Sequence, residues 1–138
     1  MAEELRQGLV GEATLTVEPE HAASRYGAAG VEVFATPVLV ALMERACIDA
    51  LEGALPPGSA TVGAGFRFQH TAATPLGATV RARAELTQVD GRRLVFQVEA
   101  FDPWEKIGGG ELERFVVQLD RFLSRVQEKA ARPPQGGG

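Results

Sequence analysis

Several features that mark particular classes of protein are scarce in this sequence. A single cysteine, Cys47, cannot form an internal disulfide, so nothing favours an oxidising compartment. Two histidines and one cysteine are too few for a typical metal cluster, and no metal site is expected. No apolar run approaches the roughly 20 residues of a membrane span, and the first residues do not resemble a signal peptide. We therefore expect a cytoplasmic protein that does not bind membranes.

Positive charge is also limited. The chain has 14 Lys and Arg against 18 Asp and Glu, a formal net charge of -4. Nucleic-acid-binding domains normally carry a basic excess, so nucleic acid is not an expected partner. An anionic ligand such as a coenzyme remains possible, because a few arginines can hold phosphates locally.

Length and patterning predict one α+β domain over residues 1–131 of the 138, followed by a disordered Pro/Gly tail at 132–138. Alternating apolar and polar residues predict strands at 8–18, 60–71, 78–89, 92–101 and 111–119. Asp90-Gly91 is typical of a tight antiparallel hairpin. A long helix is expected over about Pro37–Leu55, and a short one from Asp120, as its cap, to about Ala131.

The long helix is apolar nearly all round, so one flat sheet would not cover it. We expect a five-stranded antiparallel sheet that curves around the helix, or a helix that also faces a second subunit. The segment Pro19–Ala35 is long for a plain connection, which indicates a lid or part of a binding site.

Glu44 breaks the pattern of this helix. Arg45, Asp49 and Glu52 share a narrow solvent-facing stripe, whereas Glu44 lies among apolar neighbours. A buried carboxylate without a partner is strongly destabilising. Glu44 is therefore either a structural group satisfied by a nearby donor or a functional carboxylate that lines a cavity.

His70 is a second polar group on an apolar face. Strand alternation places these residues on one side: Val62, Ala64, Phe66, Phe68 and His70. A satisfied core histidine is one interpretation. However, Glu44 is expected in the same layer, and a carboxylate with an imidazole in an apolar cleft is a common acid–base arrangement.

Thr36 is first of all expected to be the helix N-cap, although helix N-termini also attract anions. Thr36 and Glu44 are eight residues apart, about 12 Å along a straight helix, so they cannot touch. If both act on one substrate, the substrate spans that distance, the backbone bends near Thr36, or a second subunit contributes.

Two other candidates are weaker. Cys47 has no evident base on its helix face and is expected to be buried and inert. The triplet Gly108–Gly110 lacks the Lys-Ser/Thr of a phosphate loop and is expected to form a turn or bulge.

Five segments form a recognisable set. They are Val33-Phe34-Ala35-Thr36-Pro37, Leu42-Met43-Glu44-Arg45-Ala46-Cys47, His70-Thr71-Ala72-Ala73-Thr74-Pro75, Asp90-Gly91-Arg92-Arg93-Leu94, and Ile107-Gly108 with Glu113-Arg114. Together they resemble the fluoroacetyl-CoA thioesterase family of hot-dog-fold proteins, and the resemblance extends over roughly residues 8–130.

The resemblance implies a hot-dog fold and an acyl-CoA thioesterase, a hydrolase with a catalytic set of Thr36, Glu44 and His70. It also implies substrate contacts at Gly63 and Arg114. Subunits of this family pair into a continuous sheet with active sites near the interface, so a homodimer or a dimer of dimers is expected. Coenzyme A is part of the substrate, and no separate cofactor is expected.

Two hydrolytic routes are open from the residues. Glu44 could attack the thioester carbonyl, or Glu44 or His70 could activate water. Thr36 would position substrate or water, or itself attack. A non-catalytic module that binds an acyl-CoA or another acyl ligand is the alternative function. A dehydratase on this fold would typically pair Asp and His a few residues apart after a strand, and the sequence has no such pair.

One stretch departs from the family. Fluoroacetate-specific members carry an aromatic-rich lid before the Phe-Ala-Thr segment, whereas the stretch from Tyr26 to Phe34 is shorter and has no earlier phenylalanine. The acyl group is therefore not fixed by the resemblance.

Overall fold

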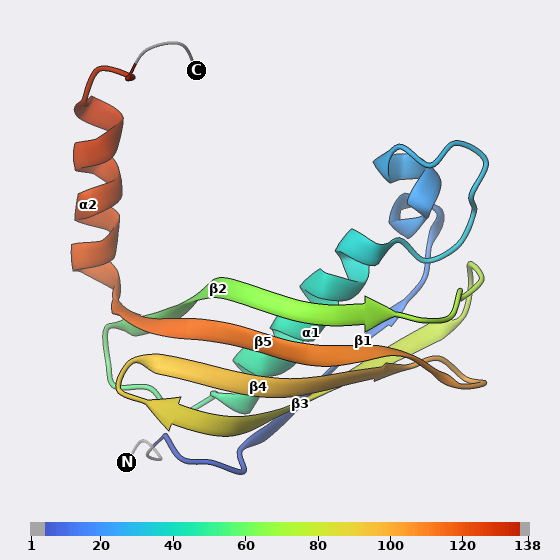
Figure 1. Cartoon of the computed structure of the whole chain (residues 1–138), viewed down its shortest axis with the longest axis horizontal. Coiled ribbons are helices and arrows are strands. Elements are labelled where there is room, and N and C mark those ends of the chain that lie inside the picture. The colour runs from blue at the N-terminus through green and yellow to red at the C-terminus, as the bar shows by residue number, and fades with distance from the viewer. Residues whose placement is uncertain (1–4, 136–138) are drawn as a thin grey trace.

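The computed structural model describes residues 5–135. Its strands form one antiparallel sheet in the order β1-β3-β4-β5-β2, with α1 against one face (Figure 1). The elements are β1 (Val10–Thr16), two short 3₁₀ helices (Pro19–His21 and Ala23–Tyr26), α1 (Thr36–Ala50), β2 (Ser59–His70), β3 (Thr79–Asp90), β4 (Arg93–Phe101), β5 (Lys106–Gln118) and α2 (Leu119–Ala131). The predicted α+β architecture is confirmed. Residues 136–138 of the expected tail lie outside the described range, and 132–135 form neither helix nor strand.

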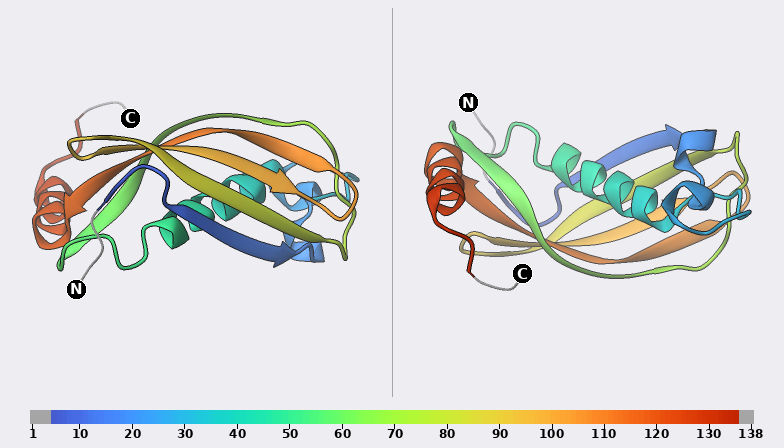
Figure 2. Two further views of the ribbon diagram at one scale, coloured as in Figure 1. Left: turned by 90° about the horizontal axis from the view of Figure 1, so that it is seen from below. Right: turned by 90° about the horizontal axis from the view of Figure 1, so that it is seen from above.

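The sheet curves around α1, which lies along its concave side (Figure 2). The helix buries one face completely: Leu39, Met43, Ala46 and Cys47 have no exposed area. Gly11 on β1 allows the closest approach, because a Cβ there would collide with the backbone of Ala46 and Ala50. Because Gly11, Ala46 and Ala50 are small, α1 packs closely on β1. None of the helices within residues 5–135 is long and apolar enough to span a membrane.

Several element boundaries differ from those predicted. β1 spans Val10–Thr16 rather than 8–18, and α1 ends at Ala50 rather than Leu55, because residues 51–54 form turns. The N-cap of α2 is Gln118 rather than Asp120, since the side-chain Oε1 of Gln118 accepts a 2.7 Å hydrogen bond from the backbone N–H of Arg121.

The glycine triplet at 108–110, predicted to form a turn or a bulge, lies inside β5, which begins at Lys106, and forms no turn. The pairing of β5 with β4 shifts in register beside the triplet, where Ala100 pairs with Gly108 and Phe101 with Lys106. A Cβ on Gly108 would lie 2.6 Å from the backbone oxygen of Gln69, and one on Gly109 would lie 2.9 Å from that of Val98. The triplet is therefore required because neighbouring strands approach closely.

A β-bulge in β2 changes which side chains face α1. The register with β5 shifts between Gly63 and Gly65, so Ala64 is an extra residue in β2. Before the bulge, Thr61 and Gly63 face the concave side, where their neighbours are Arg114 and Glu44. The sequence pattern predicts Val62 and Ala64 there. For Val62, which pairs with Phe115, this prediction is wrong because an inserted residue reverses the alternation, whereas Ala64 lines the same cavity as Glu44.

Beyond the bulge the predicted alternation holds, with Phe66, Phe68 and His70 on the concave side. Phe66 pairs with buried Leu112 of β5 and yet is 59% exposed. β2 is an edge strand of the sheet. α1 therefore does not cover the concave side of the sheet at Phe66 of β2.

Candidate functional site

The first of two polar clusters joins the start of α1 to the end of β2. Ala35 is the N-cap of α1 and no side chain caps it, so Thr36 is not the N-cap that the sequence predicted. Its hydroxyl instead lies 2.8 Å from Nδ1 of His70. The buried Phe34 ring and the imidazole pack in a T-shaped arrangement, with ring centroids 6.3 Å apart.

The imidazole of His70 is held in an apolar environment. Burial lowers its pKa below the usual 6.5, and the acceptor effect of the Ala72 backbone, which raises the pKa, is the smaller of the two. The neutral ring therefore prevails at pH 7, and its Nδ1 can accept the hydroxyl proton of Thr36 while Nε2 carries a proton. Nε2 is buried without a hydrogen-bond partner among residues 5–135. Such an unsatisfied buried group is uncommon and calls for a functional explanation.

The second cluster surrounds Glu44 in the middle of α1. Its Oε2 forms a 2.8 Å ion pair with Nη1 of Arg114 on β5. The Arg114 side chain is 6% exposed and is fixed by two further 2.9 Å hydrogen bonds, from Nε to the hydroxyl of Thr61 and from Nη2 to the Thr61 carbonyl oxygen. The Glu44 side chain is 37% exposed, and only Oε2 has a partner among the described residues. Oε1 is thus available to a ligand.

Gly63 lies directly against this carboxylate. A Cβ at this position would be 2.8 Å from Oε2 of Glu44 and 3.5 Å from Nη1 of Arg114. Beside them is a cavity of about 280 Å³, lined by Glu44, Gly63, Ala64, Gly65, Phe66, Leu112 and Glu113. The residues predicted as substrate contacts, Gly63 and Arg114, are therefore both neighbours of Glu44.

Glu44 and His70 do not meet within one chain. Among residues 5–135, Glu44 bonds to Arg114 while His70 bonds to Thr36, and no contact joins the two clusters. Thr36 and Glu44 remain about 12 Å apart along α1, which is a continuous helix without a bend. Each cluster alone supplies only part of an acid–base arrangement.

A third polar cluster was not signalled by any pattern in the sequence. Fully buried Thr74 donates a 2.8 Å hydrogen bond to Oδ2 of Asp102, and Oδ1 accepts from the backbone N–H groups of Trp104 and Glu105 at 2.9 and 3.0 Å. Burial opposes ionisation of Asp102, but these bonds outweigh it and lower its pKa. The pairing ties the loop after His70 to the β4–β5 connection.

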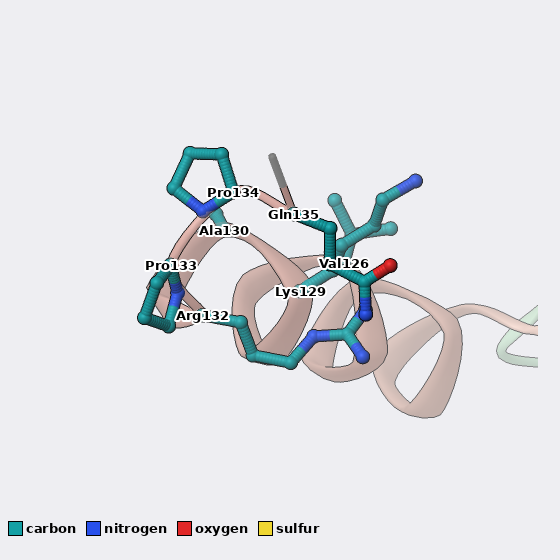
Figure 3. Close-up of a pocket in the computed structure, with 7 residues that line it drawn as sticks. All are labelled: Val126, Lys129, Ala130, Arg132, Pro133, Pro134 and Gln135. Atoms are coloured by element: carbon teal, nitrogen blue, oxygen red, sulfur yellow. The ribbon is translucent and has the colours of Figure 1, made fainter. Parts of the chain in front are cut away.

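Other candidates do not contribute to these clusters. Burial raises the pKa of the Cys47 thiol to about 12, as expected for an inert cysteine. A larger hollow of about 840 Å³ lies at the far end of α2, where Val126, Lys129 and Ala130 face the residues that follow the helix (Figure 3). Thr36, Glu44 and His70 do not line it. Residues 5–135 contain no group of three or more metal-binding side chains.

Comparison with known proteins gives concordant matches. The family described as fluoroacetyl-CoA-specific thioesterase matches residues 17–120. A fluoroacetyl-CoA thioesterase from Streptantibioticus cattleyicolor is 47% identical over 98 residues, which cover 71% of this chain and 70% of that protein.

Solved structures agree with these sequence matches. The fluoroacetyl-CoA thioesterase FlK superposes with a TM-score of 0.86 at 37% identity, covering 95% of this chain and 100% of FlK. A mutant of FlK in complex with fluoroacetate and CoA gives a TM-score of 0.80 at 40% identity, covering 86% and 99%. A hot-dog-like protein from Thermanaerovibrio acidaminovorans gives 0.85 at 25% identity, covering 94% and 96%. The predicted hot-dog fold is confirmed.

Proposed function

The chain belongs to the fluoroacetyl-CoA-specific thioesterase family, and on that premise we propose that it hydrolyses an acyl-CoA with Thr36, Glu44 and His70. The observation that carries this proposal is the pair of clusters on α1. One holds a neutral imidazole against a hydroxyl, and the other holds a carboxylate with one free oxygen beside a cavity. Coenzyme A enters as part of the substrate and leaves as a thiol, and no other cofactor is needed.

The chemistry breaks one C–S bond and adds one water. In one route, Oε1 of Glu44 attacks the carbonyl carbon and expels the thiolate, and water then cleaves the mixed anhydride. In the other, the carboxylate takes a proton from the attacking water. In both, Arg114 fixes the carboxylate, the Thr36–His70 pair positions substrate or water, and the backbone N–H near Gly63 supports the oxyanion.

A second copy of the chain brings the two clusters together in this proposal. β2 is an open edge, and antiparallel pairing with another β2 would satisfy its backbone and cover Phe66. A two-fold axis near Phe66 places Gly63 of one copy opposite the His70 end of the other. Each site then takes Glu44 from one subunit and the Thr36–His70 pair from its partner.

Short acyl groups fit this arrangement best. The cavity beside Glu44, about 280 Å³, is at the lower end of the range for ligand pockets. In the segment 19–35, Phe34 is buried against His70 and Tyr26 is 54% exposed, so an aromatic lid is not built here. Fluoroacetyl-CoA is then one short substrate among several. The lone buried cysteine is compatible with the reducing cytoplasm.

The test is release of free thiol from a panel of short, medium, branched and aromatic acyl-CoAs, fluoroacetyl-CoA included. We expect turnover on short acyl groups, and a loss of about 100- to 10,000-fold in Glu44→Gln. Glu99→Gln is the matched control, because that carboxylate pairs with Lys106 and does not line the cavity beside Glu44. Wild-type turnover in Glu44→Gln would contradict the catalytic role. Binding by calorimetry without thiol release from any substrate would assign the chain as an acyl-ligand binding module.

A further inference from the structure

The helix α2 presents an apolar stripe that its own chain covers only in part. It follows β5 and extends past the β2 edge, away from the rest of the molecule (Figure 1). None of its residues is buried, and Leu119, Leu123 and Val126 are 41%, 46% and 49% exposed. With Ala130 they follow a spacing of four, three and four, which aligns them on one face. Such a face on a projecting helix marks an interaction surface.

The charges of α2 indicate what kind of surface would cover it. Its basic residues and the one that follows it, Arg121, Arg125, Lys129 and Arg132, outnumber its acidic residues, Asp120 and Glu128. The segment 19–35, together with the residue before it, has the opposite balance, with Glu18, Glu20 and Glu32 against Arg25. This acidic segment also exposes two large apolar side chains, Tyr26 at 54% and Val31 at 43%.

The position of α2 matches that segment in a second copy. The backbone N–H of Leu119 donates to the Gly58 oxygen, so α2 starts beside the first residues of β2. Pairing of two β2 strands, as proposed above, brings the loop 71–75 of the partner to this place. That loop holds the acidic segment, because Phe34 N–H donates a 2.9 Å bond to the Thr74 oxygen and Val33 bridges Pro75.

We infer that the apolar stripe of α2 packs on the segment 19–35 of a second copy of this chain. This inference depends on the dimer in the proposed function and extends it. The segment leads directly into Thr36. The helix of one subunit therefore supports, from outside, the segment that shapes the acyl site containing the other subunit's Thr36.

Photochemical cross-linking of the full chain tests this contact. Leu123 is replaced by p-benzoylphenylalanine in one preparation, and Ser124, which lies about 130° around α2 from the centre of the stripe, in the control. Mixing heavy- and normal-isotope subunits distinguishes contacts between chains from those within one. We expect Leu123→p-benzoylphenylalanine to form links between chains that map to residues 19–35, and the Ser124 control to form none there. Links within one chain, links to another segment, or no links from position 123 would overturn the inference.

A second measurement separates this inference from the proposed function. In Leu123→Asp with Val126→Asp, we expect trypsin to cut after Arg25 several-fold faster than in wild type, whereas Ser124→Asp should match wild type. Thiol release and sedimentation are measured on the same wild-type protein. If the wild type is an active dimer and the double variant is cleaved no faster, the α2 contact alone is overturned. If the wild type is an inactive dimer and the double variant is cleaved faster, only the proposed hydrolase is overturned. A monomeric wild type would overturn both the dimer and the contact.

Discussion

Gly63 and Glu44 lie so close that a methyl group added to the glycine would be 2.8 Å from the carboxylate Oε2. The backbone of Gly63 is not in the left-handed region, so the residue is needed here for space and not for conformational freedom. Its role is to let β2 approach the carboxylate without a side chain between them.

The first prediction follows from that contact. Gly63→Ala should push the Glu44 carboxylate away from its position while leaving the fold intact, and kcat/KM should fall on the order of 100-fold. Gln97→Ala, at an exposed position of β4 outside the cavity beside Glu44, is the control. Equal activity of the two variants would show that the space beside Glu44 is not used by substrate.

The second prediction concerns the hydroxyl of Thr36. Thr36→Val keeps the shape of the side chain but removes the 2.8 Å contact with Nδ1 of His70, so kcat should fall about 100-fold or more. Thr36→Ser restores the hydroxyl and should recover most of the rate. Thiol-release kinetics on the three proteins measure this, and a fully active Thr36→Val would remove Thr36 from the catalytic set.

The third prediction is the pH dependence due to His70. Because burial lowers its pKa below 6.5, the neutral form is retained at pH 7 and is lost only as the pH falls through the lower folded-state value. The contribution of His70 to stability should therefore be constant above 6.5 and decline from 6.5 down to the folded-state value, whereas kcat/KM should fall only as the pH passes through the folded-state value. NMR titration of the imidazole and a pH–rate profile measure these changes.

The other histidine provides the control for that experiment. Nδ1 of His21 accepts a 3.0 Å hydrogen bond from the backbone N–H of Glu18, and it lies outside both clusters. His21→Gln should leave the acid limb of the profile in place. A His70 titration at or above 6.5 would contradict the assigned environment.

The fourth prediction concerns stability. Asp102→Ala removes the acceptor of three hydrogen bonds and leaves the buried hydroxyl of Thr74 unsatisfied, so the free energy of unfolding should fall by about 2 to 4 kcal/mol. Asp120→Ala, at an exposed site, should change it little. Urea denaturation of both variants at pH 7 measures the difference.

The contribution of Asp102 should also depend on pH. Its folded-state pKa is below 3.8, so its contribution is complete above 3.8 and is lost as the pH falls through the folded value. The difference between wild type and Asp102→Ala should thus shrink in strong acid. A difference that stays constant down to that range would mean that the charge of Asp102 does not stabilise the fold.

Features set by neighbours along the chain could be predicted from the sequence. The Asp90-Gly91 turn forms the expected hairpin between β3 and β4, with Gly91 at φ +61°. Glu44 was recognised because it lies off the solvent-facing stripe of α1, and the structure supplies the nearby donor that such a group requires. Helical periodicity contains this information because it depends only on residues a few positions apart.

Features set by distant pairing could not be predicted. Arg114 is 70 residues from Glu44, and Thr74 is 28 residues from Asp102. The bulge at Ala64 is also invisible to alternation, because one inserted residue changes the facing side chains without disturbing the apolar pattern. Gly63-Ala64-Gly65 is the one local sign of it, since glycines within a strand often mark bulges.

The burial of Cys47 has a practical consequence for measuring released coenzyme with a thiol-reactive dye. Its thiol is enclosed by the core and holds its proton at neutral pH, so a thiol-reactive dye added to the folded protein should react with released coenzyme alone. The same side chain becomes reactive when the core opens. One reagent can thus count product in the native protein and, without substrate, time the unfolding of each variant.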